Sequence, residues 1–320
     1  MKLSSILFLT IPTMSLIGCS GSHFINVSPN VSTNNLHATV DFLSTIDPPR
    51  VYYNKDSLEK CVEYISKKFI EYGYKPDFQK FNVPANSSTL SDETYKNIIA
   101  SAGPTNGERI IIGAHYDVCG EQPGADDNAS GIAGLLEIAR FAKSHEKKLP
   151  LRVDFVAFCL EEPPFFGTTN MGSYAHAEMM NKMKIKVRAM ICLDMIGFFR
   201  DEKNTQDYPV ELMKIFYPSK GNFISVVGNF SSRSLVNSLE TCFEKTKLNV
   251  ETYSGPTFIP GIDFSDHRNY WHFDYKAAMI SDSAFYRNPN YHKTTDTIDT
   301  LDFNRMKKVV EAVCYKIVGN

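Results

Sequence analysis

The segment RIIIGAHYDVCGEQPGADDNASGIAGLLEIARFAK, residues 109–143, decides the fold class. It begins with an apolar run at residues 110–114, which predicts a buried strand. A loop with two glycines follows, and from Gly131 the apolar residues recur at helical spacing. A buried strand that leads into a covering helix is the repeating unit of a parallel sheet.

The rest of the chain continues this alternation. Apolar runs predict further strands at residues 97–102, 151–160, 187–193, 223–227 and 277–280. Apolar residues at helical spacing predict helices at residues 57–72, 173–184, 234–247 and 304–317. We therefore predict a single α/β domain with a mostly parallel, mixed central sheet and helices on both faces. In such folds ligands bind beyond the carboxyl ends of the strands.

The N-terminus resembles the signal of a bacterial lipoprotein. Lys2 precedes an apolar run that is too short to span a bilayer comfortably and ends in LIGC at residues 16–19. We predict a lipoprotein signal peptide at residues 1–18, a lipid anchor on Cys19, a flexible tether at 19–35 and a folded domain at 36–320. Ser20 after the cysteine favours the outer membrane. An ordinary secretory signal, giving a periplasmic or secreted protein, is the alternative.

The composition narrows the classes of function. Hydrophobic residues make up 43% of the chain, charged residues 22%, and the net charge is −2. These values are ordinary for a globular protein and lack the basic excess of nucleic-acid binders, so we expect no nucleic-acid partner. Six cysteines follow Cys19 without CxxC spacing, and we expect Cys159 and Cys192, inside apolar strands, to be buried free thiols. No pattern specifies an oligomeric state.

Residues suited to metal binding follow the ends of several predicted strands. They are His115 with Asp117, the pair Glu161 and Glu162, Asp194 and His292. Asp126 and Asp127 add two more carboxylates just before the helix that starts at Gly131. Each alone has an ordinary explanation, such as an aspartate that caps a helix. Together, at one edge of one sheet, they predict a metal site, because zinc takes imidazole nitrogen and carboxylate oxygen.

The residue types also suit a pair of zinc ions. Two histidines and three carboxylates supply one bridging ligand and two terminal ligands for each ion. A further carboxylate must stay off the metal to shuttle a proton. Glu161 and Glu162 could divide these roles, because neighbours in an extended segment point in opposite directions. Asp117, two residues from His115, could hold that imidazole in its ligating tautomer.

Four segments resemble the zinc aminopeptidase family known as M28, in that family's order. They are AHYDVCGEQPGADDNASGIAGLLEIAR at 114–140, FCLEEPPFFG at 158–167, CLDMIG at 192–197 and NPNYHKTTDTIDTL at 288–301. The resemblance implies a zinc exopeptidase-like fold, two Zn2+ ions per chain and a peptide substrate. It also implies a role for individual residues: His115 and Asp194 on one zinc ion, Glu162 and His292 on the other, Asp127 as the bridge, Glu161 as general base, Tyr291 beside the developing oxyanion, and Asp266 in support of the site. A cis peptide bond after Asp127 is part of the same expectation.

The resemblance leaves the reaction open among related choices. We predict removal of N-terminal residues, but the core motif does not specify which end of a peptide enters, so a carboxypeptidase is an alternative. A glutaminyl cyclase-like acyltransferase would have one zinc ion and a changed bridging segment. A non-catalytic binding module would have lost ligands. The intact segment 126–131 and the complete ligand set favour the peptidase.

Two further segments bear on the substrate. Family members often read EExGLxGS where this chain has EEPPFFGT at 161–168, and two prolines stiffen that loop and remove two backbone donors. Residues 198–222 are polar and rich in aromatic residues, and they form either a surface insertion or a flap over the substrate. His176, on a predicted helix, is expected at the surface rather than at the metal site.

Overall fold

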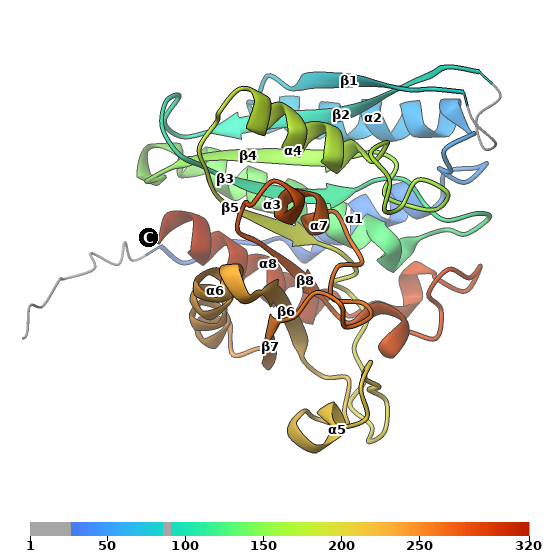
Figure 1. Ribbon diagram of the computed structural model, residues 1–320, viewed down its shortest axis with the longest axis vertical. Helices are drawn as coiled ribbons and strands as arrows, with labels where there is room; N and C mark the ends of the chain where they lie inside the picture. The colour runs from blue at the N-terminus through green and yellow to red at the C-terminus, as the bar shows by residue number, and fades with distance from the viewer. Residues whose placement is uncertain (1–26, 86–90, 320) are drawn as a thin grey trace, which may run out of the picture.

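A mixed eight-stranded sheet organises the chain in a computed structural model that describes residues 27–85 and 91–319 (Figure 1). Its strand order is β1-β2-β4-β3-β5-β8-β6-β7. The strands are β1 Asp77–Val83, β2 Glu93–Ala102, β3 Arg109–His115, β4 Arg152–Phe158, β5 Val187–Leu193, β6 Ile224–Asn229, β7 Val250–Gly255 and β8 Ala277–Ser281.

The central strands are parallel. Strand β3 lies between β4 and β5 and runs parallel to both, and β8 runs parallel to β5. These four strands therefore direct their carboxyl ends to the same edge of the sheet. Antiparallel pairing joins β1 to β2, β2 to β4, and β8 to β6, whereas β7 is parallel to β6. The predicted α/β class with a mixed central sheet is confirmed.

Helices cover both faces, as the sequence predicted. They are α1 Thr33–Ser44, α2 Lys55–Glu71, α3 Gly131–Ser144, α4 Gly172–Lys182, α6 Arg233–Thr246, α7 His267–His272 and α8 Phe303–Val318. The short α5, Met213–Phe216, has no buried residue and lies away from the sheet. Alternate residues of β3 face opposite cores: Ile110 and Ile112 pack in the larger core, and Ile111 packs in the smaller one. Helices α4 and α7 lie on the viewer's side of the sheet in Figure 1 and contact each other.

The two strands missed by the sequence pattern, β1 and β7, are the edge strands of the sheet. Most residues of β1 are exposed or half-buried, with only Val83 buried, and most of those of β7 are half-buried. Neither strand therefore carries a continuous apolar run, which was the signal used for the central strands.

The N-terminal boundary of the folded domain lies earlier than expected. Part of the predicted tether packs on the domain, because Val27 and Val31 are buried and α1 begins at Thr33. The Ser32 backbone N–H donates to Glu137 of α3 at 2.8 Å, which fixes this entry to the larger core. The predicted signal peptide, the Cys19 anchor and the first part of the tether lie outside the described residues. Within the described ranges, no helix is long and apolar enough to cross a membrane.

Candidate metal centre

The candidate ligands gather at the carboxyl edge of the parallel strands. His115 is the last residue of β3, Asp194 comes directly after β5, and Glu162 follows β4 by four positions. Asp127 lies in the segment Ala125–Ser130, which joins the loop after β3 to α3, and the backbone is kinked there because Asp127 and Asn128 have non-helical φ and ψ angles. These four residues are buried, and the His292 side chain, from the loop after β8, is 26% exposed. The structure thus brings all five predicted ligands to one place.

Asp127 lies between the two histidines. Its Oδ1 is 3.3 Å from His115 Nε2, and its Oδ2 is 3.2 Å from His292 Nε2. Asp194 Oδ1 lies 3.8 Å from the same nitrogen of His115, and Glu162 Oε2 lies 3.2 Å from that of His292. Each oxygen of Asp127 therefore faces one histidine–carboxylate pair. The Asp127–Asn128 peptide bond is cis, as expected from the resemblance.

The donor atoms of the cluster are arranged to bind metal ions rather than to hydrogen-bond to one another. His115, Asp127 and Asp194 can offer ligand atoms within 4.8 Å of one another, and so can Glu162 and His292 together with Cys119. Four atoms here are buried without a hydrogen-bond partner, although their neighbours are close: Nε2 of both histidines, Oδ2 of Asp127 and Oε1 of Glu162. Buried polar atoms without partners are rare, and ligation of cations would satisfy all four.

Charge in the cluster also favours cations. Burial, with the added charge of Asp127, raises the pKa of Glu162 to about 8. Burial likewise raises the pKa of Glu161 well above its ordinary range, and the neighbouring Glu162 and Asp194 charges add to it while His115 opposes it. Carboxylates crowded in a buried site resist ionisation together, and a divalent cation relieves that repulsion.

Comparison with known proteins identifies the family. The sequence profile of peptidase family M28 matches residues 97–317. The chain belongs to peptidase family M28. It is 41% identical over 303 residues to the uncharacterized protein YfbL of Escherichia coli strain K12, covering 91% of this chain and 90% of that protein.

Two further matches are to proteins whose names state an activity. It is 26% identical over 295 residues to leucine aminopeptidase 1 of Metarhizium robertsii, covering 88% of this chain and 68% of that protein. Its fold matches the crystal structure of Bacteroides thetaiotaomicron glutaminyl cyclase with a TM-score of 0.70 and 20% identity, over 92% of this chain and 100% of that one. The fold is therefore shared with a structure named as a glutaminyl cyclase, and the site has to distinguish that activity from the one in the name of the sequence match.

Asp117 orients the paired glutamates of the M28 site. Its carboxylate accepts hydrogen bonds from the backbone N–H groups of Glu161 at 3.2 Å and Glu162 at 3.1 Å. Its backbone carbonyl lies 3.2 Å from His115 Nδ1, closer than its carboxylate at 3.7 Å. The expected contact with His115 is therefore made mainly through the main chain, and the carboxylate fixes the segment that carries the glutamates.

The Asn128 side chain, rather than either aspartate before it, accepts the first backbone N–H of helix α3. Its Oδ1 accepts from the Gly131 N–H at 2.9 Å, and its amide donates to the Leu193 carbonyl. Gly131 is required at this start, because a Cβ there would lie 2.5 Å from that same carbonyl. Asp126 instead accepts from Gly197 N–H and from the Asn288 amide, both buried. The helix start is thus locked to the end of β5, which carries Asp194.

Asp296 supports the bridging residue and was not singled out by the sequence analysis. Its two carboxylate oxygens accept the backbone N–H groups of Asp126 at 3.0 Å and Asp127 at 3.1 Å. Burial and the charge of Asp126 raise its pKa to about 7. Asp296 lies within the quoted segment 288–301, but nothing in residue spacing pairs it with a loop 169 positions away.

We expect Asp296→Asn to weaken zinc binding by about 10–100-fold, the usual effect of losing a group that orients a ligand. The asparagine keeps one carbonyl oxygen, but its NH₂ group would face a backbone N–H. Competition with a fluorescent zinc chelator measures the change. Asp299→Asn, at an exposed position three residues away, is the matched control. Equal affinities for Asp296→Asn and the control would contradict the positioning role.

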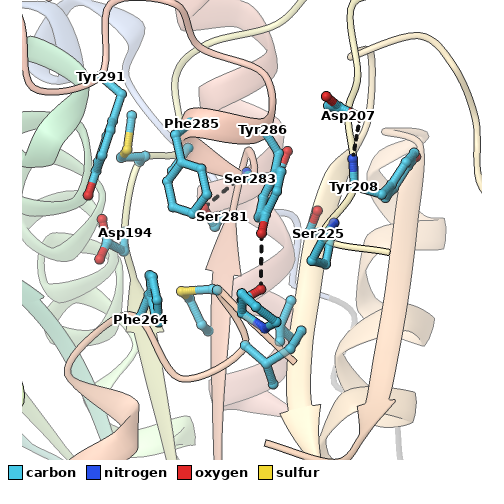
Figure 2. Close-up of a pocket in the computed structure, with 18 of the residues that line it drawn as sticks. Asp194, Asp207, Tyr208, Ser225, Phe264, Ser281, Ser283, Phe285, Tyr286 and Tyr291 are labelled. Carbon is cyan, nitrogen blue, oxygen red and sulfur yellow. Dashed lines mark hydrogen bonds between the residues drawn. The ribbon is translucent and has the colours of Figure 1, made fainter. Parts of the chain in front are cut away.

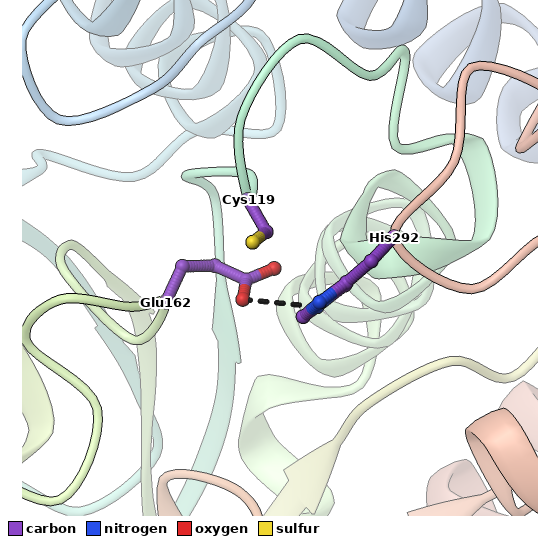
Figure 3. A group of neighbouring side chains, drawn as sticks. All are labelled: Cys119, Glu162 and His292. Atoms are coloured by element: carbon purple, nitrogen blue, oxygen red, sulfur yellow. Dashed lines mark ion pairs between the residues drawn. The ribbon is translucent and has the colours of Figure 1, made fainter.

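Cys119 is a second neighbour that the sequence analysis did not single out. Its side chain points toward Glu162 and His292, whose ion pair is 3.2 Å long (Figure 3). Among the described cysteines, Cys119 alone is not buried, whereas Cys159 and Cys192 are buried free thiols as predicted. A thiol two residues beyond Asp117 gave no motif, because its approach depends on the path of the following loop.

Tyr291 and Asp266 border the cluster in different ways. The Tyr291 ring stacks on the His292 ring with centroids 3.8 Å apart, and burial raises its pKa, so the phenol keeps its proton. Asp266 is buried directly before α7, and neither of its carboxylate oxygens has a hydrogen-bond partner. Burial raises the pKa of Asp266 to about 7, with His115 opposing the shift and Asp194 adding to it.

A cavity of about 290 Å³ opens beside the cluster (Figure 2). Asp194 and Tyr291 lie at one end of it, and Ser225 and Tyr208 lie at the other. Parts of the segment 198–222 line this cavity, which supports its description as a flap rather than a detached surface insertion.

His176 is not part of the site. It is fully buried, contrary to expectation, and its Nδ1 lies 2.7 Å from the Tyr270 hydroxyl.

Proposed function

We propose that this M28 peptidase is a zinc-dependent aminopeptidase that binds two zinc ions and removes N-terminal residues from peptides. The observation that carries the proposal is the position of Asp127, whose two oxygens each face one histidine–carboxylate pair. His115 and Asp194 would hold one ion, Glu162 and His292 would hold the other, and Asp127 would bridge them.

The protein side chains divide the remaining work. Bound zinc would polarise the scissile carbonyl and lower the pKa of a water molecule. Glu161 accepts the proton of the attacking water and delivers it to the leaving amine, because Glu162 is engaged as a ligand. Its Oε2 is 3.9 Å from His115 Nε2, so it borders the cluster from the cavity side. Tyr291, protonated and facing the same cavity, donates to the developing oxyanion.

The carboxylate-rich end of the cavity favours a free amine. Asp127, Glu161, Glu162 and Asp194 all line it, and Glu161, which the proposal leaves off the metal, would attract an N-terminal ammonium group. A carboxypeptidase would instead need a cationic group for the substrate's C-terminal carboxylate. At the cluster end, the cavity is lined by carboxylates, His292 and Tyr291 but no Lys or Arg side chain among the described residues.

A panel of peptides tests the proposal. The zinc-loaded enzyme should release the first residue of free peptides and leave N-acetylated copies intact, as measured by mass spectrometry. Cyclisation of an N-terminal glutamine without hydrolysis of any free peptide would instead support the glutaminyl cyclase alternative. Release of C-terminal residues from acetylated peptides would support the carboxypeptidase. A chain that binds zinc and cleaves none of these peptides would support a binding module.

Export and lipidation form a separate part of the proposal. The LIGC segment at residues 16–19 supports cleavage before Cys19 and attachment of lipid to that cysteine in the bacterial envelope, with the outer membrane favoured. We expect the wild-type chain to incorporate labelled palmitate and to sediment with membranes, and Cys19→Ser to do neither while its peptidase activity survives. A wild-type chain that is unlabelled and stays in the soluble periplasmic fraction would contradict the anchor.

A further inference from the structure

The floor of the cavity is one face of the strands β8, β6 and β7. Strand register places Ser225 of β6 directly between Ser281 of β8 and Glu251 of β7. Because adjacent strands present paired residues on the same face, these three side chains form a polar row across the sheet. All three line the cavity. The row therefore leads away from the metal cluster and ends in a carboxylate.

Glu251 and the metal cluster lie at opposite ends of the cavity. Three strand spacings separate β5, which ends beside Asp194, from β7, which carries Glu251. At about 4.8 Å per spacing, this amounts to roughly 14 Å. Figure 2 shows Asp194 and Ser225 on opposite sides of the cavity. Only a long substrate side chain could extend from the cluster toward Glu251.

No described residue forms an ion pair or hydrogen bond with the Glu251 carboxylate. The residue is half-buried, and Tyr208 and Tyr217 lie near enough for its charge to raise the pKa of each, in addition to burial. Burial, with the charge of Glu240, raises the pKa of Glu251 itself. A cation that entered this end of the cavity would gain a partner and relieve that unfavourable burial.

Between its two ends the cavity is apolar and aromatic. The floor contributes Met279, Val227 and Tyr253, which form the row beside the polar one. Opposite walls contribute further aromatic rings, including Phe264 and Phe285. Lysine and arginine combine an apolar methylene stem with a charged end, and aromatic faces attract such a cation. The lining thus matches these side chains along their whole length.

We infer that this cavity is a binding subsite for the side chain of an N-terminal lysine or arginine, with Glu251 as its counter-ion. The inference rests on the proposed aminopeptidase function and adds the class of residue that the enzyme prefers. The Ser225 hydroxyl, which is paired with Glu251 in the strand register, would accept a further hydrogen bond from the cationic group. A leucine side chain would contact the apolar section and leave Glu251 without a partner.

The test compares kcat/KM of the zinc-loaded full-length enzyme for the p-nitroanilides of arginine, lysine and leucine. We expect the wild type to favour arginine and lysine over leucine. Glu251→Gln should lower the arginine-to-leucine ratio of kcat/KM by roughly 10–100-fold, as expected for loss of a charge-assisted hydrogen bond. The matched control is Glu240→Gln, which removes a nearby carboxylate that does not line the cavity and should leave the ratio unchanged.

Three outcomes would overturn this inference. If the wild type prefers leucine, the cationic subsite is wrong. It is also wrong if Glu251→Gln and the Glu240→Gln control have the same arginine-to-leucine ratio of kcat/KM. Both results leave the aminopeptidase proposal intact. If the enzyme binds its full complement of zinc but hydrolyses none of the three substrates, both the cationic subsite and the aminopeptidase proposal are wrong. Circular dichroism of each variant ensures that a changed ratio is measured on folded protein.

Discussion

Replacing Glu161 with glutamine is expected to lower kcat by roughly 10²–10⁴-fold while the zinc content stays near that of the wild type. The amide keeps the size of the side chain and much of its hydrogen bonding but lacks a basic oxygen. Glu161 is buried, and its Oε2 lies 3.9 Å from His115 Nε2. Its backbone N–H donates a hydrogen bond to the Asp117 carboxylate, which fixes its position. The fold and the remaining ligands should therefore survive, and the loss should fall on proton transfer.

Glu162→Gln is the matched control for this experiment, because the two glutamates are adjacent and equally buried. This substitution should remove zinc from the His292 side of the site as well as lower activity. Zinc is measured by mass spectrometry of the metal after dialysis, and kcat by hydrolysis of an aminoacyl p-nitroanilide. If Glu161→Gln loses zinc and Glu162→Gln retains it, the two roles are reversed. If both variants keep full activity, the mechanism is wrong.

The second large effect is expected for Asp127→Asn. Loss of a group that merely orients a ligand costs about 10–100-fold in metal affinity, and loss of the bridge should cost more at both ions. Zinc content should fall toward zero after dialysis, and peptide hydrolysis should become undetectable. Asp127 contacts both histidines through different oxygens, so one substitution reaches both halves of the cluster.

Thermal unfolding separates this effect from misfolding. Zinc that binds only the folded chain raises Tm, and the rise grows with the ratio of zinc concentration to Kd. The wild type should show this rise, and Asp127→Asn should unfold at a temperature that zinc does not change. An Asp127→Asn variant that retains two zinc ions per chain would contradict the bridging role, whatever its activity.

The central strands, and the placing of several candidate ligands at one edge, followed from the sequence for one physical reason, whereas the choice of Asp127 and of Glu162 as ligands came from the resemblance to M28. A parallel strand buried on both faces must be apolar throughout, so a charged residue directly after it, such as Asp194, stands out. Because the carboxyl ends of β3, β4, β5 and β8 share an edge, residues after these strands must meet. The parallel direction expected of these strands thus predicted that His115, Asp194 and the paired glutamates lie at one edge.

Other features depended on contacts that the sequence does not encode locally. Edge strands β1 and β7 are partly exposed and lack a continuous apolar run. His176 faces the sheet instead of solvent, because α4 packs between β2 and α7 and Tyr270 supplies a partner for the imidazole. Asp296 and Cys119 reach the site through loops, whose paths no periodicity predicts. Glu251 belongs to an edge strand and acquires its significance only through its register with Ser225.

The most direct test of this account is anomalous diffraction from crystals of the zinc-loaded chain, recorded above and below the zinc edge. The account predicts two peaks on either side of the Asp127 carboxylate, one next to His115 and Asp194 and the other next to Glu162 and His292. Their separation should be about 3.5–4 Å, as in other two-metal hydrolases. A single peak, or peaks away from Asp127, would contradict the two-zinc site.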